Sequence, residues 1–190
     1  MNTPLDLAKR DALPDALRVL VEQFPRDAWE YHKNYSGLIA FWLQKHMSFR
    51  KLMERLNADA EQALDGNADP MRYKQALSRF GGMLINELHG HHQIEDAHYF
   101  PVMARLDKKV SAGFDLLDKD HHALDGILAG LTGGANAVLQ ENRGGAAFRD
   151  EVAAFRGLLR DFDPMLNRHL IDEEELVVPV LLKYAPAQFR

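Results

Sequence analysis

The sequence contains no cysteine, which excludes disulfides, thiolate metal ligands and cysteine nucleophiles. It has no apolar run long enough to span a bilayer, and residues 1–6 lack the charged start and apolar core of a signal peptide. Its basic residues are dispersed and its net charge is -5, so no basic surface is expected for nucleic acid or anionic lipid. We therefore expect a cytoplasmic protein with no nucleic-acid or membrane partner, in which any metal site uses nitrogen and oxygen ligands.

Apolar residues recur at three- and four-residue spacings over most of the chain, as in amphipathic helices, and no alternating strand pattern appears. A chain of 190 residues suffices for one domain with a buried core. We predict an all-α fold, an up-down-up-down antiparallel four-helix bundle with a short helical N-terminal extension. The extension is residues 1–33, the bundle 34–184 and the C-terminal tail 185–190. The helices are expected at about 34–64, 70–108, 114 to the turn at 142–145, and 146–184, with a kink near Pro101 and a bend at Gly133 and Gly134.

Two stretches on the second and fourth predicted helices repeat one another. His91 precedes Glu95 by four residues, and His169 precedes Glu173 by four residues. Each glutamate stands six residues before a proline. Because four residues advance a helix by little more than one turn, each histidine and its glutamate project from the same helix face. That is the arrangement of two side chains that can reach one metal centre.

The first and third predicted helices each add one histidine to this pattern. His46 and His121 lie on apolar stripes, followed at similar spacings by further apolar residues. A lone histidine on such a stripe is more often an ordinary core residue, but two buried glutamates require a compensating charge. The repeat therefore predicts one metal site built from six side chains: His46, His91, Glu95, His121, His169 and Glu173.

These ligand types suit iron, zinc, manganese or nickel, and do not select among them. If both glutamates bridge, the site holds two ions about 3.5 to 4 Å apart, each with two histidines. A bridging oxygen from water would make each ion five-coordinate and leave an open position. Such a site suits dioxygen, nitric oxide, peroxide or a small anion.

The paired His-x-x-x-Glu frame resembles the hemerythrin family in its broader hemerythrin-like (HHE cation-binding) form, over residues 34–184. The resemblance implies a four-helix bundle with two non-haem iron ions joined by an oxo or hydroxo bridge. It also implies that the protein binds dioxygen or another small ligand such as nitric oxide or peroxide, in oxygen, redox or iron sensing or handling. Carried over position by position, the iron ligands are the six side chains named above.

The chain departs from the oxygen-carrying members of the family on its third helix. They have two histidines four residues apart there, whereas Asp125 stands four residues after His121 here. Their last helix also spaces histidine and carboxylate by five residues, where Glu173 follows His169 by four. With four histidines, both ions have an open position, so sensing or oxidase- and peroxidase-like chemistry is favoured over bulk oxygen carriage.

Further polar residues near this frame are additional or second-sphere candidates. Asp125 is a seventh ligand, orients an imidazole or is solvated, and the last two roles are favoured. His122 replaces His121 if the helix register is shifted by one residue, and His98 stands nearly above His91. His92 and Asp96 repeat the four-residue spacing on a neighbouring face, but the late stretch has no counterpart to them.

Other functional classes fit the sequence less well. A ferritin-like di-iron carboxylate protein needs two Glu-x-x-His motifs, and only Glu95 with His98 forms one. A zinc hydrolase would show His-Glu-x-x-His or a serine nucleophile motif, and neither is present. A metal-free structural or partner-binding bundle is the remaining alternative. A metal- and oxygen-binding protein is favoured over a dedicated enzyme, and either a homodimer or a separate signalling partner is compatible with the sequence.

Overall fold

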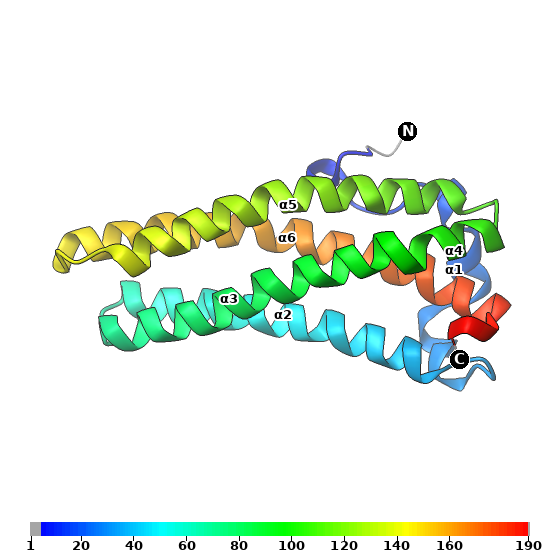
Figure 1. Cartoon of the computed structure of the whole chain (residues 1–190), viewed down its shortest axis with the longest axis horizontal. Coiled ribbons are helices and arrows are strands. Elements are labelled where there is room, and N and C mark those ends of the chain that lie inside the picture. The colour runs from blue at the N-terminus through cyan, green and yellow to red at the C-terminus, as the bar shows by residue number, and fades with distance from the viewer. Residues whose placement is uncertain (1–4, 190) are drawn as a thin grey trace. The chain divides into compact units, whose positions relative to one another are not determined.

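The computed structural model describes residues 5–189, and every regular element within that range is helical. Four long helices, labelled in Figure 1, are α2 (Gly37–Leu64), α3 (Pro70–Ile94), α5 (Ser111–Gln140) and α6 (Gly145–Tyr184). A π-helix, η4 (Glu95–Tyr99), continues α3 and leads into α4 (Phe100–Leu106). Short helical turns precede and follow these elements: η1 (Leu7–Lys9), η2 (Asp15–Leu17), α1 (Val19–Gln23), η3 (Arg26–Tyr31) and η5 (Ala187–Phe189).

The helix starts follow the local sequence signals. The Ser36 carbonyl accepts a hydrogen bond from the Ala40 N–H (3.1 Å), so Ser36 is the N-cap of α2, close to the expected start at about residue 34. The Asp69 carboxylate accepts from the Arg72 N–H (2.9 Å), and Pro70 occupies the first turn of α3, where its missing N–H has no cost.

The predicted second helix is broken into three segments. The Phe100 N–H donates to the Glu95 carbonyl, five residues back, which defines the π turn. Pro101 follows immediately and has no N–H to donate, so the irregularity lies just before the proline at which a kink was expected.

At Gly133 and Gly134, where the sequence predicts a bend, α5 continues as one helix to Gln140. A Cβ atom on Gly134 would lie 2.7 Å from the Leu158 side chain on α6. Close approach of the two helices, not a break, explains the glycine at this position.

By the density of their contacts, the described residues divide into two compact units. Unit 1 comprises residues 5–47, 92–122 and 165–189, and unit 2 comprises residues 48–91 and 123–164. Within unit 2, the rings of Tyr73 and Phe148 meet edge to face at 6.0 Å. Unit 1 contains one hydrophobic cluster that includes Trp42, Phe100 and Leu117, together with the apolar residues of α6 from Leu176 onward.

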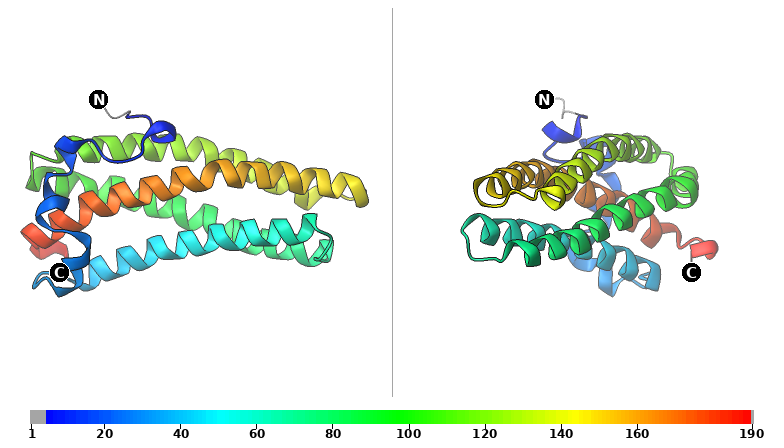
Figure 2. Two further views of the ribbon diagram at one scale, coloured as in Figure 1. Left: turned by 180° about the vertical axis from the view of Figure 1, so that it is seen from behind. Right: turned by 60° about the vertical axis from the view of Figure 1, so that its left-hand side comes forward.

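The N-terminal segment belongs to the hydrophobic cluster of unit 1. Leu13, Leu17, Leu20 and Trp29 are buried there. Figure 2 shows this segment, in blue, beside the red C-terminal end of α6. Within residues 5–189, no helix combines the length and the apolar character needed to cross a lipid bilayer.

Candidate metal centre

Three buried imidazoles meet in unit 1. His92 comes from the last turn of α3, His121 from α5 and His169 from α6, and each offers a nitrogen within 4.8 Å of the others. The rings of His92 and His121 are stacked, with centroids 4.0 Å apart and an interplanar angle of 10°. The His169 ring stands edge-on to both, at 5.3 and 4.9 Å. Three imidazole nitrogens at this spacing can converge on one metal ion.

Two fully buried carboxylates lie beside these rings. One oxygen of Glu173 is 3.4 Å from His46 Nε2, and its other oxygen is 3.6 Å from His169 Nε2. Glu95 Oε2 is 3.6 Å from His121 Nε2. Glu95, Glu173 and His46 also offer ligand atoms that lie within 4.8 Å of one another. Glu173 therefore stands between His46 and the three-histidine group, which is the position of a carboxylate able to bridge two ions.

His91 is the last residue of unit 2 and lies one helical turn before Glu95. It is half-buried, and its ring is 5.4 Å from that of Phe49, which follows His46 by three residues on α2.

Acidic side chains bind the outer nitrogens of the clustered histidines. His121 Nδ1 is 2.8 Å from Asp96 Oδ1, and His46 Nδ1 is 3.0 Å from Glu174 Oε1. Asp96 directly follows Glu95 at the π turn, so consecutive carboxylates approach opposite nitrogens of the same ring. A carboxylate that accepts the Nδ1–H fixes the tautomer and orientation of an imidazole and raises the basicity of Nε2.

The charges of this cluster are strongly perturbed by burial and by one another. Burial alone would lower the pKa of His46, but Glu173 and Glu174 outweigh burial and raise that pKa to about 9. Burial and the neighbouring Glu173 raise the pKa of Glu95 well above its ordinary value. Burial lowers the pKa of His169 despite the nearby Asp120 carboxylate. Buried acidic groups that perturb one another in this way need a compensating charge, which a metal ion could supply.

Of the six predicted ligands, five lie together in unit 1: His46, Glu95, His121, His169 and Glu173. The additional candidates do not join them. His98 is exposed, and the His122 side chain is 76% exposed with Nδ1 2.8 Å from the Asp118 carbonyl. Asp125 is exposed and pairs with His89 in unit 2, with Nδ1 to Oδ1 at 3.2 Å.

The sequence analysis missed two contributors to this cluster. His92 is 2% exposed and stacks on His121, although it has no counterpart in the repeat. The adjacent His91-His92 pair was the available signal, since neighbouring residues on a helix can each face a different part of one site. Trp42, which the sequence did not connect with the site, is buried and donates its indole N–H to Glu173.

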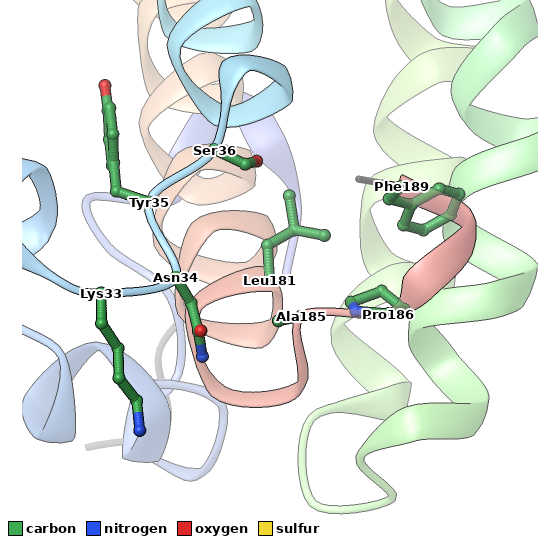
Figure 3. A pocket seen from close by; sticks show the side chains of 8 residues that line it. All are labelled: Lys33, Asn34, Tyr35, Ser36, Leu181, Ala185, Pro186 and Phe189. Carbon is green, nitrogen blue, oxygen red and sulfur yellow. The ribbon is translucent and has the colours of Figure 1, made fainter.

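Hydrogen bonds among the clustered side chains leave several buried nitrogens unsatisfied, and a metal ion could use such nitrogens. His121 Nε2 and both ring nitrogens of His169 are buried without a hydrogen-bond partner among the residues described. Such nitrogens are costly in a protein interior unless a metal ion uses them. A surface pocket of about 290 Å³ lies elsewhere in unit 1, between residues 33–36 and the C-terminal residues 181–189 (Figure 3). Its lining residues include none of the clustered histidines and glutamates.

One of three comparisons with known proteins gave a match. Curated proteins and solved structures gave no match to the chain. Residues 37–181, which include all of the clustered side chains, match the family model of the hemerythrin HHE cation-binding domain. The His and Glu clusters can hold a metal, and the chain belongs to the hemerythrin HHE cation-binding family.

Proposed function

We propose that this protein is a non-haem di-iron protein that binds dioxygen, or another small ligand such as nitric oxide or peroxide. Its four long helices would form an up-down-up-down antiparallel bundle. The short connections at residues 65–69 and 141–144 support this arrangement, since such loops join antiparallel neighbours. The observation that carries the proposal is the burial of three imidazoles with two carboxylates placed to bridge.

The ligands divide between the two ions by their positions. His92, His121 and His169 would hold one ion. His46 would hold the other with His91, which is assigned because it stands one helical turn before Glu95. Glu95 and Glu173 would be shared, in line with the 3.4 and 3.6 Å approaches of the Glu173 oxygens to histidines of both groups.

This assignment adds His92 to the four histidines expected from the repeat. Together with a solvent-derived bridge, the three-histidine ion would have six donors and the other ion five. One position, on the ion of His46 and His91, is then open to a small ligand. A single open position on a reducible metal pair suits binding and sensing of oxygen or nitric oxide, and iron supplies that redox chemistry when bound.

Iron content and optical spectra test the proposal. Protein reconstituted with Fe²⁺ under nitrogen and then exposed to air should contain about two iron ions per chain and show near-ultraviolet charge-transfer bands that shift when azide is added. His121→Ala should lose iron, and the matched control His122→Ala should keep it because that side chain is 76% exposed. A well-folded wild-type protein that stays colourless and iron-free after reconstitution would overturn the proposal.

A further inference from the structure

Two arginines of the N-terminal segment reach carboxylates that face outer nitrogens of the clustered histidines. Arg10 follows η1, and Arg26 begins η3, so both lie outside the matched residues 37–181. All of the contacts described below lie within unit 1. They connect the segment to two different histidines, one from each proposed ion.

Arg10 is the first connection. Its guanidinium is fully buried and donates to both oxygens of Asp120. Its Nε also donates to Asp172 Oδ2, at 2.8 Å. Asp120 Oδ2 lies 3.6 Å from His169 Nδ1. Asp120 is therefore held between a bidentate arginine and the outer nitrogen of His169, with little freedom to rotate.

Arg26 is the second connection. Its Nη1 donates to Glu174 Oε2 at 2.6 Å, while the other Glu174 oxygen is 3.0 Å from His46 Nδ1. The guanidinium stacks over the Trp29 ring at 4.6 Å. Trp29 is itself fixed, since it is buried and its indole N–H donates to the Phe24 carbonyl at 2.7 Å. Packing against the fixed Trp29 ring therefore restricts the orientation of the Arg26 guanidinium that donates to Glu174.

These contacts have a simpler interpretation, in which the ion pairs only attach the segment to the rest of unit 1. The apolar contacts of Leu13, Leu17, Leu20 and Trp29 already attach it, however. Each arginine also ends on a carboxylate that faces an outer histidine nitrogen, Arg10 on Asp120 and Arg26 on Glu174. Partners of this kind set the orientation and basicity of metal-binding imidazoles.

We propose that Arg10 and Arg26 are positioning residues of the metal centre, which act through Asp120 on His169 and through Glu174 on His46. This inference rests on the proposed function, in which both histidines bind metal. The N-terminal segment then sets metal affinity as well as covering the core, and residues outside the family domain become part of its site.

Titration of the full-length, metal-free protein with Co²⁺, whose visible ligand-field bands report ligand geometry, tests this inference. Arg10→Met and Arg26→Met should each raise the Co²⁺ dissociation constant about ten-fold and shift the bands. Arg10→Lys should recover only part of the affinity, because an ammonium cannot bind two carboxylates as the guanidinium fork does. The control Lys9→Met removes the same charge from an exposed side chain whose ion pair is with Asp6, and should match the wild type.

Thermal unfolding of the metal-free variants separates a positioning role from simple attachment. If the arginine variants unfold at lower temperature but keep the wild-type Co²⁺ affinity and spectrum, the positioning role is wrong. If Arg10→Met fails to fold, the test rests on Arg26→Met, because the Arg26 side chain is half-exposed and its replacement perturbs the core less. An unchanged Co²⁺ dissociation constant in Arg26→Met then overturns the inference. Wild-type protein that binds no Co²⁺ would instead overturn the proposed function.

Discussion

Replacing His92 with alanine distinguishes a five-histidine centre from the four-histidine centre that the sequence repeat predicts. The ring of His92 is one of three imidazoles whose nitrogens lie within 4.8 Å of one another. Its loss should weaken the ion held by His121 and His169. Removal of a mere supporting partner of a metal ligand costs about 10- to 100-fold in affinity, so loss of a ligand should cost about 100-fold or more.

This loss of affinity converts into a loss of metal-dependent stability. At a free metal concentration about 100 times the dissociation constant, binding stabilises the wild-type fold by about 2.7 kcal/mol. A variant that binds about 100-fold more weakly gains only about 0.4 kcal/mol at the same concentration. In a chain of this size, where about 1 kcal/mol shifts the melting temperature by roughly 2–4 °C, the gain falls from roughly 5–11 °C to about 1–2 °C.

The assay is thermal unfolding followed by circular dichroism, with and without Fe²⁺ under nitrogen. The metal-dependent gain is the quantity to compare, because His92 is 2% exposed and its removal also leaves a cavity that lowers the stability of the metal-free protein. His98→Ala is the matched control, since that histidine is exposed on η4. If His92→Ala retains the wild-type gain and iron content, His92 is not a ligand and the four-histidine set stands.

Two further predictions concern stability away from the ligands. Asp107 accepts hydrogen bonds from Lys183 (2.7 Å) and from the Tyr184 hydroxyl. Burial opposes ionisation of Asp107, but these contacts outweigh it and lower the pKa of Asp107. The ionised Asp107 therefore stabilises the fold above its unfolded pKa of about 3.9, and this stabilisation is lost as the pH falls through the lower folded pKa. Asp107→Asn should lower the free energy of unfolding, measured with urea, by about 2 kcal/mol at pH 7 and by little near pH 2. An equal cost at both pH values would contradict the assigned pKa. Gly113→Ala would place a Cβ 2.8 Å from the buried Leu176 side chain and should lower the free energy of unfolding by about 1–3 kcal/mol. Gly126→Ala places its Cβ in open space and should raise that free energy by about 0.5–1 kcal/mol, both measured by thermal unfolding. Similar effects of the two alanines would show that Leu176 moves aside.

The helices were predictable because their signals are local. Apolar spacing, the proline at position 70 and the caps at Ser36 and Asp69 are read from a few neighbouring residues, and the observed bounds of α2 and α6 differ little from those expected. The π turn was not predictable in this way. Its Phe100 N–H bonds the carbonyl of Glu95, and side-chain periodicity carries no direct record of whether a backbone bond spans four or five residues.

The six ligand positions predicted from the repeat stay a prediction, and the repeat also explains outer contacts that were not predicted from the sequence. Glu95 and Asp96 correspond to Glu173 and Glu174 in the late stretch. In each pair the second acid approaches the Nδ1 of a histidine, Asp96 that of His121 and Glu174 that of His46. The stretch that carries the first His-x-x-x-Glu frame thus supports His121 of α5, and the stretch that carries the second supports His46 of α2. Sequence spacing alone could not show this, because it depends on which helices approach one another.

The two halves of the repeat differ at one buried position beside the predicted ligands. His92 corresponds to Leu170 in the late stretch, and both side chains are buried. A strictly repeated site would give both ions the same donors and leave both open, as the four-histidine interpretation implied. An imidazole in one half and an isobutyl group in the other make the proposed centre asymmetric. Under the proposed assignment, the three-histidine ion would have no open position, and a small ligand would bind only at the ion held by His46 and His91. An asymmetric pair of this kind favours binding of one small ligand at one metal, so the departure from the repeat is more informative about function than the repeat itself.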